Sequence, residues 1–363
     1  MISTTQTLTD RQTDRQTDRQ TDRQTDRQTD RQTDRQTDRN NCLNLEKCIA
    51  CFGVVFIHMT FPGTLGVIIK CLASFAVPLF YMIAGYYAYG CTVEKIRKRL
   101  IKILKILAFA VFWWLAFEVA VNLYYGTLNV WLRANFNWKT PIKLFVFCTI
   151  DWALPLWYLI AMAETYYVWL FVVRYKKETE TAKFACFLLF AGAALTVYAE
   201  SIGLSWSYKI NFLGRAMSWF LLGYLINDQY EKKLQKISTF YLFLTVFAGW
   251  IVTLSAVLFK PSVDYNYLGV LLTAPAIFMI GVRYPNIKIG RFAEYIAEKL
   301  SLFIYIFHSL VSQVLAISVK LLGFNRDGVY AYFHPVFTLI GSIAVAIVFE
   351  HLFRNKSLRR IIY

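Results

Sequence analysis

Residues 93–125, VEKIRKRLIKILKILAFAVFWWLAFEVAVNLYY, join a dense basic cluster to a run of about 20 predominantly apolar residues. A run of that length crosses the ~30 Å hydrocarbon core of a bilayer as a helix. From Cys48 onward, apolar runs of this kind alternate with short basic clusters along the chain. The pattern predicts an all-α, polytopic integral membrane protein.

Composition supports this prediction. Of the 363 residues, 57% are hydrophobic and only 17% are charged, which is below the ~25% of an ordinary soluble domain. The net charge of +16 would suggest a nucleic-acid partner in a soluble protein. Here the basic residues lie between apolar runs, where they orient helices in a membrane. We therefore expect membrane lipid, and no nucleic acid, among the partners.

Ten transmembrane helices are predicted in a membrane domain that covers residues 42–363. The first is the weakest, because Glu46, Lys47 and His58 interrupt it. The expected spans are about 43–61, 67–90, 103–125, 153–173, 183–200, 211–227, 238–259, 265–282, 300–323 and 333–353.

Lysine and arginine are distributed unequally between the two sets of connecting loops. One set, which includes residues 95–105 and the C-terminal tail, holds well over twice as many as the other. Positively charged loops stay in the cytoplasm. The asymmetry therefore places both termini in the cytoplasm, which an even number of spans also requires, and the loop at 126–152 on the outer side.

The N-terminal tail, residues 1–41, contains the tetrapeptide Thr-Asp-Arg-Gln repeated from Thr9 to Arg39. The repeat has no net charge and no apolar residue to bury, so we expect the tail to be disordered. Three copies of the four-base unit ACAG read as the four codons that encode this tetrapeptide. A four-base repeat of this kind is prone to slippage during replication. We expect phase-variable expression, with a neutral microsatellite as the alternative. A start codon near Leu43 would bypass the repeat.

The seven cysteines show no spacing typical of a disulfide framework. Cys48 and Cys51 form a Cys-x-x-Cys sequence within the first predicted span, with no second ligand pair nearby. We interpret both as small residues for helix packing. No metal site is expected.

Two ionisable residues of the first span, Lys47 and His58, are candidates for chemistry. Eleven helical steps bring them to within about 20° on one face and about 16 Å apart along the axis. A cation near the membrane surface suits a phosphate-bearing ligand, and an imidazole suits general base catalysis. The spacing is comparable to an extended pantetheine arm. The alternative is an interfacial lysine and a histidine that bonds a neighbouring helix.

Six short motifs follow one another along the predicted spans. They are Leu45-Glu46-Lys47-Cys48 through His58, Phe75 through Tyr86, Arg99 through Lys102, Leu156-Trp157-Tyr158-Leu159, Gly223-Tyr224, and Ser301 through His308. In this order they resemble acyltransferase family 3, from about Leu43 to Phe353. Lysine replaces the family's arginine at positions 47 and 102, and Ala84 replaces its usual serine. Lysine keeps the positive charge but does not bind phosphate through two parallel hydrogen bonds.

The resemblance implies a bacterial inner-membrane enzyme that takes an acyl group from acyl-CoA, with acetyl-CoA expected, at the cytoplasmic side. Lys47 and the basic cluster would contact the CoA phosphates, and His58 would promote transfer to a glycan hydroxyl, lipopolysaccharide included. The cluster comprises Arg97, Lys98, Arg99 and Lys102. For this cluster, orientation by the positive-inside effect or contact with anionic lipid is an equal alternative.

Four further residues are candidates for binding the acceptor: Trp157, Arg215, Tyr305 and His308. Tyr305 and His308 share one helix face with Ser301. Hydrogen bonding between helices is the alternative for these three. Arg215 lies near the outer end of its predicted span, from which its side chain can extend outward.

Two other functions remain open. A transporter or flippase of a lipid-linked glycan would show internal repeats and broken helices at matching positions. A glycan polymerase or ligase would need a long polar outer loop, whereas the loop at 126–152 is short and aromatic. Neither alternative explains a cation and a histidine at this spacing.

Overall fold

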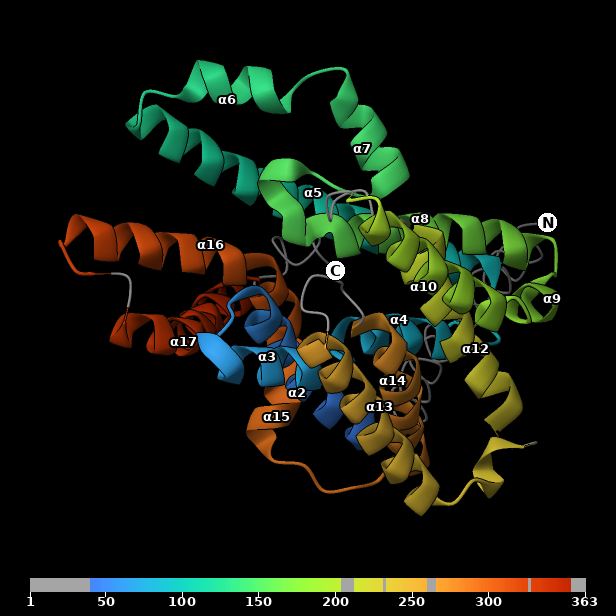
Figure 1. The fold of residues 1–363 in the computed structure, drawn as a ribbon. Coiled ribbons are helices and arrows are strands. Elements are labelled where there is room, and N and C mark those ends of the chain that lie inside the picture. Colours follow the sequence, from blue (N-terminus) through green and yellow to red (C-terminus); the bar gives the residue numbers. More distant parts are fainter. Residues whose placement is uncertain (1–39, 204–211, 231–232, 260–265, 326–327, 354–363) are drawn as a thin grey trace, which may run out of the picture.

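The computed structural model describes residues 40–203, 212–230, 233–259, 266–325 and 328–353 (Figure 1). This part of the chain is helical and contains no strand. Residues 1–39 of the predicted disordered tail lie outside the described residues, whereas Asn40 and Asn41, which the prediction placed in the tail, cap and begin α2. The elements are α2 (Asn41–His58), α3 (Gly63–Ala73), α4 (Ala76–Tyr86), α5 (Val93–Tyr124), α6 (Leu128–Asn135), α7 (Lys139–Phe147), η1 (Asp151–Leu156), α8 (Trp157–Arg174), α9 (Glu178–Ala182), α10 (Ala185–Ser201), η2 (Leu213–Met217), α12 (Ser218–Tyr230), η3 (Leu234–Lys236), α13 (Thr239–Phe259), α14 (Asn266–Arg283), α15 (Arg291–Tyr295), η4 (Ile296–Leu300), α16 (Ser301–Leu321) and α17 (Val329–Leu352).

The prediction of a polytopic all-α membrane protein is confirmed. Within the described residues, eight helical segments are long and apolar enough to cross a membrane. The predicted span at 265–282 corresponds to α14, whose apolar part, Leu268–Arg283, is shorter. The predicted span at 211–227 corresponds to η2 and α12, where Arg215 and Asp228 interrupt the apolar sequence.

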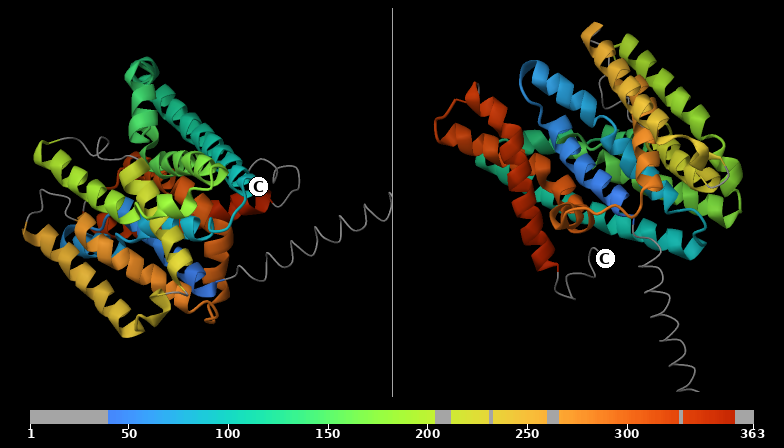
Figure 2. Two further views of the ribbon diagram at one scale, coloured as in Figure 1. Left: turned by 90° about the vertical axis from the view of Figure 1, so that its right-hand side faces the viewer. Right: turned by 90° about the horizontal axis from the view of Figure 1, so that it is seen from below.

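Helix α2 lies at the centre of the bundle and contacts α3, α4, α14, α16 and α17. Two helical hairpins pack beside it, one formed by α13 and α14 and the other by α16 and α17 (Figure 2). Asn40 anchors the start of α2: its side-chain oxygen accepts from the Leu43 amide at 2.9 Å, and its amide donates to the Gly281 carbonyl, also at 2.9 Å. The start of the first span is therefore fixed against the end of α14 at the centre of the bundle.

Helices α2 and α16 run in the same direction. At the start of α2, the Asn44 side chain donates to Glu298, just before α16, at 3.1 Å. Further along, the Cys51 thiol lies 3.9 Å from the Ser301 carbonyl oxygen. At the end of α2, His58 meets His308. These three contacts set the register between the two helices, so that residues near the start of α2 lie beside η4 and residues at its end lie beside His308.

Helix α5 also runs parallel to α16. Phe109 and Phe307 have ring centroids 6.3 Å apart. Further toward the C-terminal ends of both helices, the Glu118 side chain bonds Gln313. At their far ends, the Lys320 ammonium lies 5.8 Å from the centre of the Tyr125 ring. The basic start of α5 and the start of α2 are therefore on the same side of the molecule.

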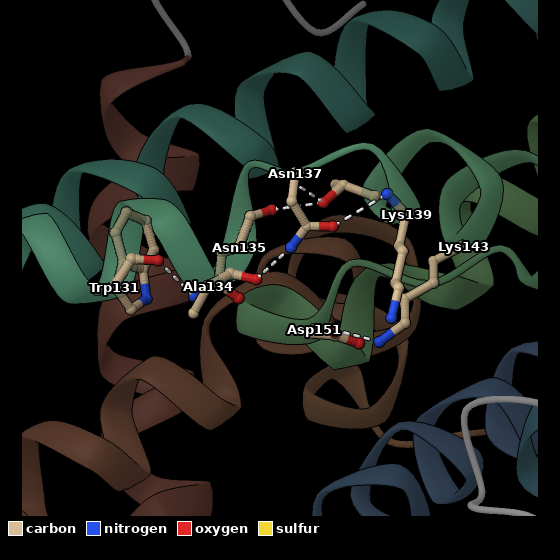
Figure 3. Close-up of polar contacts among 8 residues, drawn as sticks. Trp131, Ala134, Asn135, Asn137, Lys139, Lys143 and Asp151 are labelled. Carbon is tan, nitrogen blue, oxygen red and sulfur yellow. Dashed lines mark hydrogen bonds and ion pairs between the residues drawn. The ribbon is translucent and has the colours of Figure 1, made fainter.

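A helical arch formed by α6 and α7 follows the far end of α5 and projects from the bundle (Figure 1). Its turn is held by Asn137, which accepts from the Lys139 amide at 2.9 Å and donates to the Ala134 carbonyl at 2.7 Å (Figure 3). Lys143 forms an ion pair with Asp151 at 2.6 Å and so ties α7 to η1. The aromatic loop predicted at 126–152 is thus an ordered structure at the opposite end of α5 from the basic cluster.

The crossing of α4 and α12 depends on two glycines. Gly85 of α4 lies against the backbone of Phe220, and Gly223 of α12 lies against the backbone of Met82. A Cβ on Gly223 would lie 2.6 Å from both the carbonyl carbon and the Cα of Met82. Two of the six sequence motifs, which lie far apart in the chain, therefore meet at one helix crossing, where small residues allow close backbone approach.

Candidate active site

His58 is the last residue of α2, and its imidazole faces the imidazole of His308 on α16. The two ring centroids are 5.2 Å apart and the rings are inclined by 39°. His58 is half-buried, whereas His308 is fully buried. The Lys70 ammonium on α3 acts electrostatically on His58. This histidine pair is the centre of the candidate site.

The Nδ1 atom of His308 is tied to its own helix. It lies 2.8 Å from the Tyr305 carbonyl oxygen and 3.3 Å from the Ile304 carbonyl oxygen. Its Nε2 atom is buried and has no hydrogen-bond partner among the described residues. The hydrogen bond at Nδ1 therefore fixes the orientation of the ring, while Nε2 is left without a hydrogen bond among the described residues.

A series of aromatic side chains extends from the histidine pair. Tyr305 lies 6.3 Å from His308 and 5.4 Å from Tyr158 between ring centroids, and its hydroxyl donates to the Pro155 carbonyl. Tyr158 in turn packs against Tyr81 at 4.6 Å. Tyr81 donates to the Tyr158 carbonyl at 3.2 Å, and its ring centroid is 6.5 Å from that of Trp157. The structure thus brings together four of the predicted residues: His58, Trp157, Tyr305 and His308.

A contact with α5 shows where the histidine pair lies along the length of that helix. The indole of Trp114 donates to the Ile306 carbonyl at 3.1 Å, next to His308 in sequence. Trp114 lies near the middle of the apolar part of α5, which runs from Ile106 to Tyr124. It is 12 residues, or about 18 Å, from Lys102 along the helix. The histidine pair therefore lies near the level of the middle of the apolar part of α5.

Lys47 lies on the same helix as His58, about 16 Å toward its start. The side chain is half-buried and its ammonium lies 3.4 Å from the Asn44 oxygen. Asn44 bonds Glu298, which also interacts electrostatically with Lys47. Lys47 is thus held by a polar network between α2 and η4, away from the histidines but on the side of the basic cluster.

The predicted basic cluster lies on the first turns of α5, with one member facing inward. Arg97, Lys98 and Lys102 are exposed, and Lys98 lies 3.7 Å from Glu94. Arg99 is half-buried and donates to the hydroxyl of Tyr166 on α8. The cluster provides cations at one surface of the bundle, and Arg99 connects it to the interior through Tyr166.

Arg215 bonds a residue of α10. Its guanidinium donates to the Thr196 hydroxyl on α10 at 3.3 Å, and Thr196 is buried. The side chain is half-buried and lies against α10. The Ser301 hydroxyl donates to the Ala297 carbonyl at 3.0 Å, one turn earlier in the same helical segment.

Three of the glutamates within the predicted spans each bond a side chain from another part of the chain. Glu118 bonds Gln313, Glu164 accepts from the Cys148 thiol at 3.2 Å, and Glu350 accepts from the Tyr295 hydroxyl at 3.2 Å. These contacts agree with a role in joining helices.

Sequence reasoning missed several participants. Tyr81, Pro155 and Tyr158 lie inside or beside recognised motifs, but nothing in their spacing indicates that they surround Tyr305. Glu298 is missed because it pairs with Lys47 from a position 251 residues away in the chain. An acidic residue just before the Ser301–His308 motif is the only sequence signal for it.

The family model described as an acyltransferase domain, that of acyltransferase family 3, matches residues 40–351. The match covers α2 through nearly all of α17 and contains the histidine pair, Lys47 and the basic cluster. No curated protein matches the chain, and no solved structure matches it.

Proposed function

The chain belongs to acyltransferase family 3, and from this membership we propose that it transfers an acyl group, acetyl by expectation, from acyl-CoA to a hydroxyl of a cell-surface or lipid-linked glycan such as lipopolysaccharide. It is a multi-pass membrane acyltransferase. We further propose that it resides in the bacterial inner membrane with both termini in the cytoplasm. The donor, the acceptor and this location are parts of the proposal.

The central observation is the histidine pair deep in the bundle, with cations one pantetheine length away on one side. Lys47 and the start of α5 lie on that side, because α2 and α5 both run parallel to α16. CoA phosphates bound there would allow the thioester to reach His58. Cations attract phosphate, and lysine does so as a point charge.

In the proposed reaction, His58 removes the proton from an acceptor hydroxyl. The hydroxyl oxygen then attacks the thioester carbonyl, a new ester bond forms, and the carbon–sulfur bond breaks. The released thiolate takes the proton, so the reaction is balanced without another reactant. A positioned general base contributes typically 10²–10⁴-fold to such a step.

The acceptor would approach from the end of α5 that carries the helical arch. There Trp131, Phe136 and Trp152 form an aromatic cluster with ring centroids 5.7–6.3 Å apart. Trp157, Tyr305 and His308 line the route inward in this proposal. Aromatic faces of this kind are suited to packing against sugar rings.

The test is to express the chain, His58→Ala and Lys47→Ala in a host that lacks its own copy but makes the native glycan. Mass spectrometry then measures whether the glycan gains a base-labile mass of one acetyl group. We expect a gain that His58→Ala abolishes and Lys47→Ala lowers, at equal membrane levels of protein. A gain that survives His58→Ala would reject His58 as the base. No acyl gain from the wild type would reject the transfer and favour transport of a lipid-linked glycan.

We also propose that slippage in the ACAG repeat switches expression on and off. The repeat lies outside the described residues. Sequencing clonal isolates, with immunoblots of the same cultures, tests this proposal. Variable repeat numbers that correlate with presence or absence of the protein are expected, and one fixed number in all isolates contradicts it.

A further inference from the structure

The bonding of His308 identifies which of its nitrogens bears a hydrogen. Both atoms near Nδ1, the carbonyl oxygens of Tyr305 and Ile304, can only accept hydrogen bonds. Nδ1 must therefore be the donor. A neutral imidazole carries one hydrogen, so Nε2 has a free lone pair.

That lone pair is enclosed in the protein. His308 is fully buried and its Nε2 has no partner in the part of the chain that the structure describes. Buried acceptors are normally satisfied, so each exception requires an explanation. The neighbouring ring of His58 offers one: the ring centroids are 5.2 Å apart and the structure shows no bond between the rings, but a small rotation of the half-buried His58 side chain would bring one of its nitrogens to hydrogen-bond distance of Nε2.

Of the described groups that act electrostatically on His58, His308 can accept a proton and the Lys70 ammonium cannot. The groups acting on His58 among the described residues are His308 and Lys70, and neither is an acid. The nearby Tyr305 hydroxyl is already donated to Pro155. In serine hydrolases a carboxylate orients the catalytic histidine and stabilises its protonated form. Here the neighbour of His58 is a second imidazole, in ring contact with it.

We propose that His308 is the proton acceptor behind His58, which goes beyond the acceptor-binding role considered above and rests on the proposed function. One ring nitrogen of His58 takes the hydroxyl proton while the other passes its own proton to Nε2 of His308. His308 then holds the positive charge as the ester bond forms and the thioester breaks. The protons return by the same path, and the thiolate of CoA takes the proton released by the hydroxyl.

Two substitutions separate this role from a structural one. His308→Asn retains a donor placed to bond the Tyr305 carbonyl but has no Nε2. His308→Gln retains a polar atom near the Nε2 position but cannot accept a proton at neutral pH. We expect both to lower kcat for acetyl transfer by about 100-fold, with KM for acetyl-CoA unchanged. His308→Ala should regain activity when imidazole is added.

Protein level in the membrane and thermal unfolding in detergent are measured for every variant. A His308→Asn variant with at least half the wild-type kcat would overturn the proposal, as would a folded His308→Ala variant that imidazole does not restore. If wild-type protein transfers no acetyl group, the proposed function fails instead. Active wild type with active His308 variants rejects only the relay.

A second measurement does not depend on folded His308 variants. Nitrogen-15 NMR of histidine-labelled wild-type protein reports the protonation of each ring nitrogen. His58→Ala, His334→Gln and His351→Gln each remove one signal, and the remaining signal belongs to His308, because the chain has four histidines. A bare Nε2 supports the proposal, and a protonated Nε2 at neutral pH overturns it.

Discussion

Gly223→Ala provides a sharp test of the helix crossing that holds two of the sequence motifs together. The added Cβ would lie closest to the Met82 carbonyl oxygen, and 2.6 Å from the Met82 carbonyl carbon and Cα, which is already 0.8 Å short of the 3.4 Å at which ordinary contact begins. All three obstructing atoms belong to the backbone, so no side chain can move aside. Helices α4 and α12 would have to separate.

The expected cost is about 2 kcal/mol of unfolding free energy or more. Overpacking a well-packed core costs about 1–3 kcal/mol, and a gap of 0.5–1 Å forfeits roughly a quarter to a half of each dispersion contact. Here the separating surfaces include buried Phe220, Leu221 and Met82. The better helix propensity of alanine offsets about 1 kcal/mol. A loss of this size lowers the ratio of folded to unfolded protein by about 30-fold.

The assay is thermal unfolding of the purified protein in detergent, followed by tryptophan fluorescence. We expect Gly223→Ala to melt several degrees below wild type. Two controls grade the effect. Gly53→Ala places its Cβ 3.2 Å from the Ala73 Cβ and should cost little, and Gly290→Ala meets no atom within 4 Å. A Gly223→Ala variant as stable as Gly290→Ala would refute the geometry of the α4–α12 crossing.

Three further predictions follow from single contacts. Glu298→Gln keeps an oxygen for Asn44 but removes the charge beside Lys47, so KM for acetyl-CoA should fall severalfold at unchanged kcat; an unchanged KM argues against phosphate binding by Lys47. Tyr305→Phe loses the hydrogen bond to the Pro155 carbonyl and should cost about 0.5–1.5 kcal/mol in thermal unfolding, the net contribution of a typical hydrogen bond; an unchanged melting temperature would contradict this. Arg215→Ala should lower the melting temperature and leave KM for the glycan unchanged, since its guanidinium bonds Thr196; a raised KM at unchanged stability would support acceptor binding instead.

Much of the candidate site was accessible from residue patterns. His58 and Lys47 stand out because ionisable residues are costly in a membrane span. Their helical spacing predicts a shared face, and α2 is indeed one continuous helix from Asn41 to His58. The motif from Ser301 to His308 places Tyr305 beside His308 on a helix, as observed.

The partners of these residues were not accessible in this way. Spacing does not reveal that Glu298 engages Lys47, or that Tyr305 bonds Pro155. Arg215 was expected near an outer surface, and its contact with Thr196 depends on how α10 packs against η2. Each contact joins elements that are far apart in the chain, so no local pattern predicts it.

The sequence by itself determined that the chain is helical and crosses a membrane many times, because span length and hydropathy are local properties set by the thickness of the bilayer. Tertiary structure alone decided that His58 meets His308 and that Gly85 and Gly223 share a crossing. Helix partners in lipid are selected by close packing and hydrogen bonds, since lipid tails are as apolar as the helix surfaces. Such complementarity is a property of two surfaces together and is not present in either helix alone.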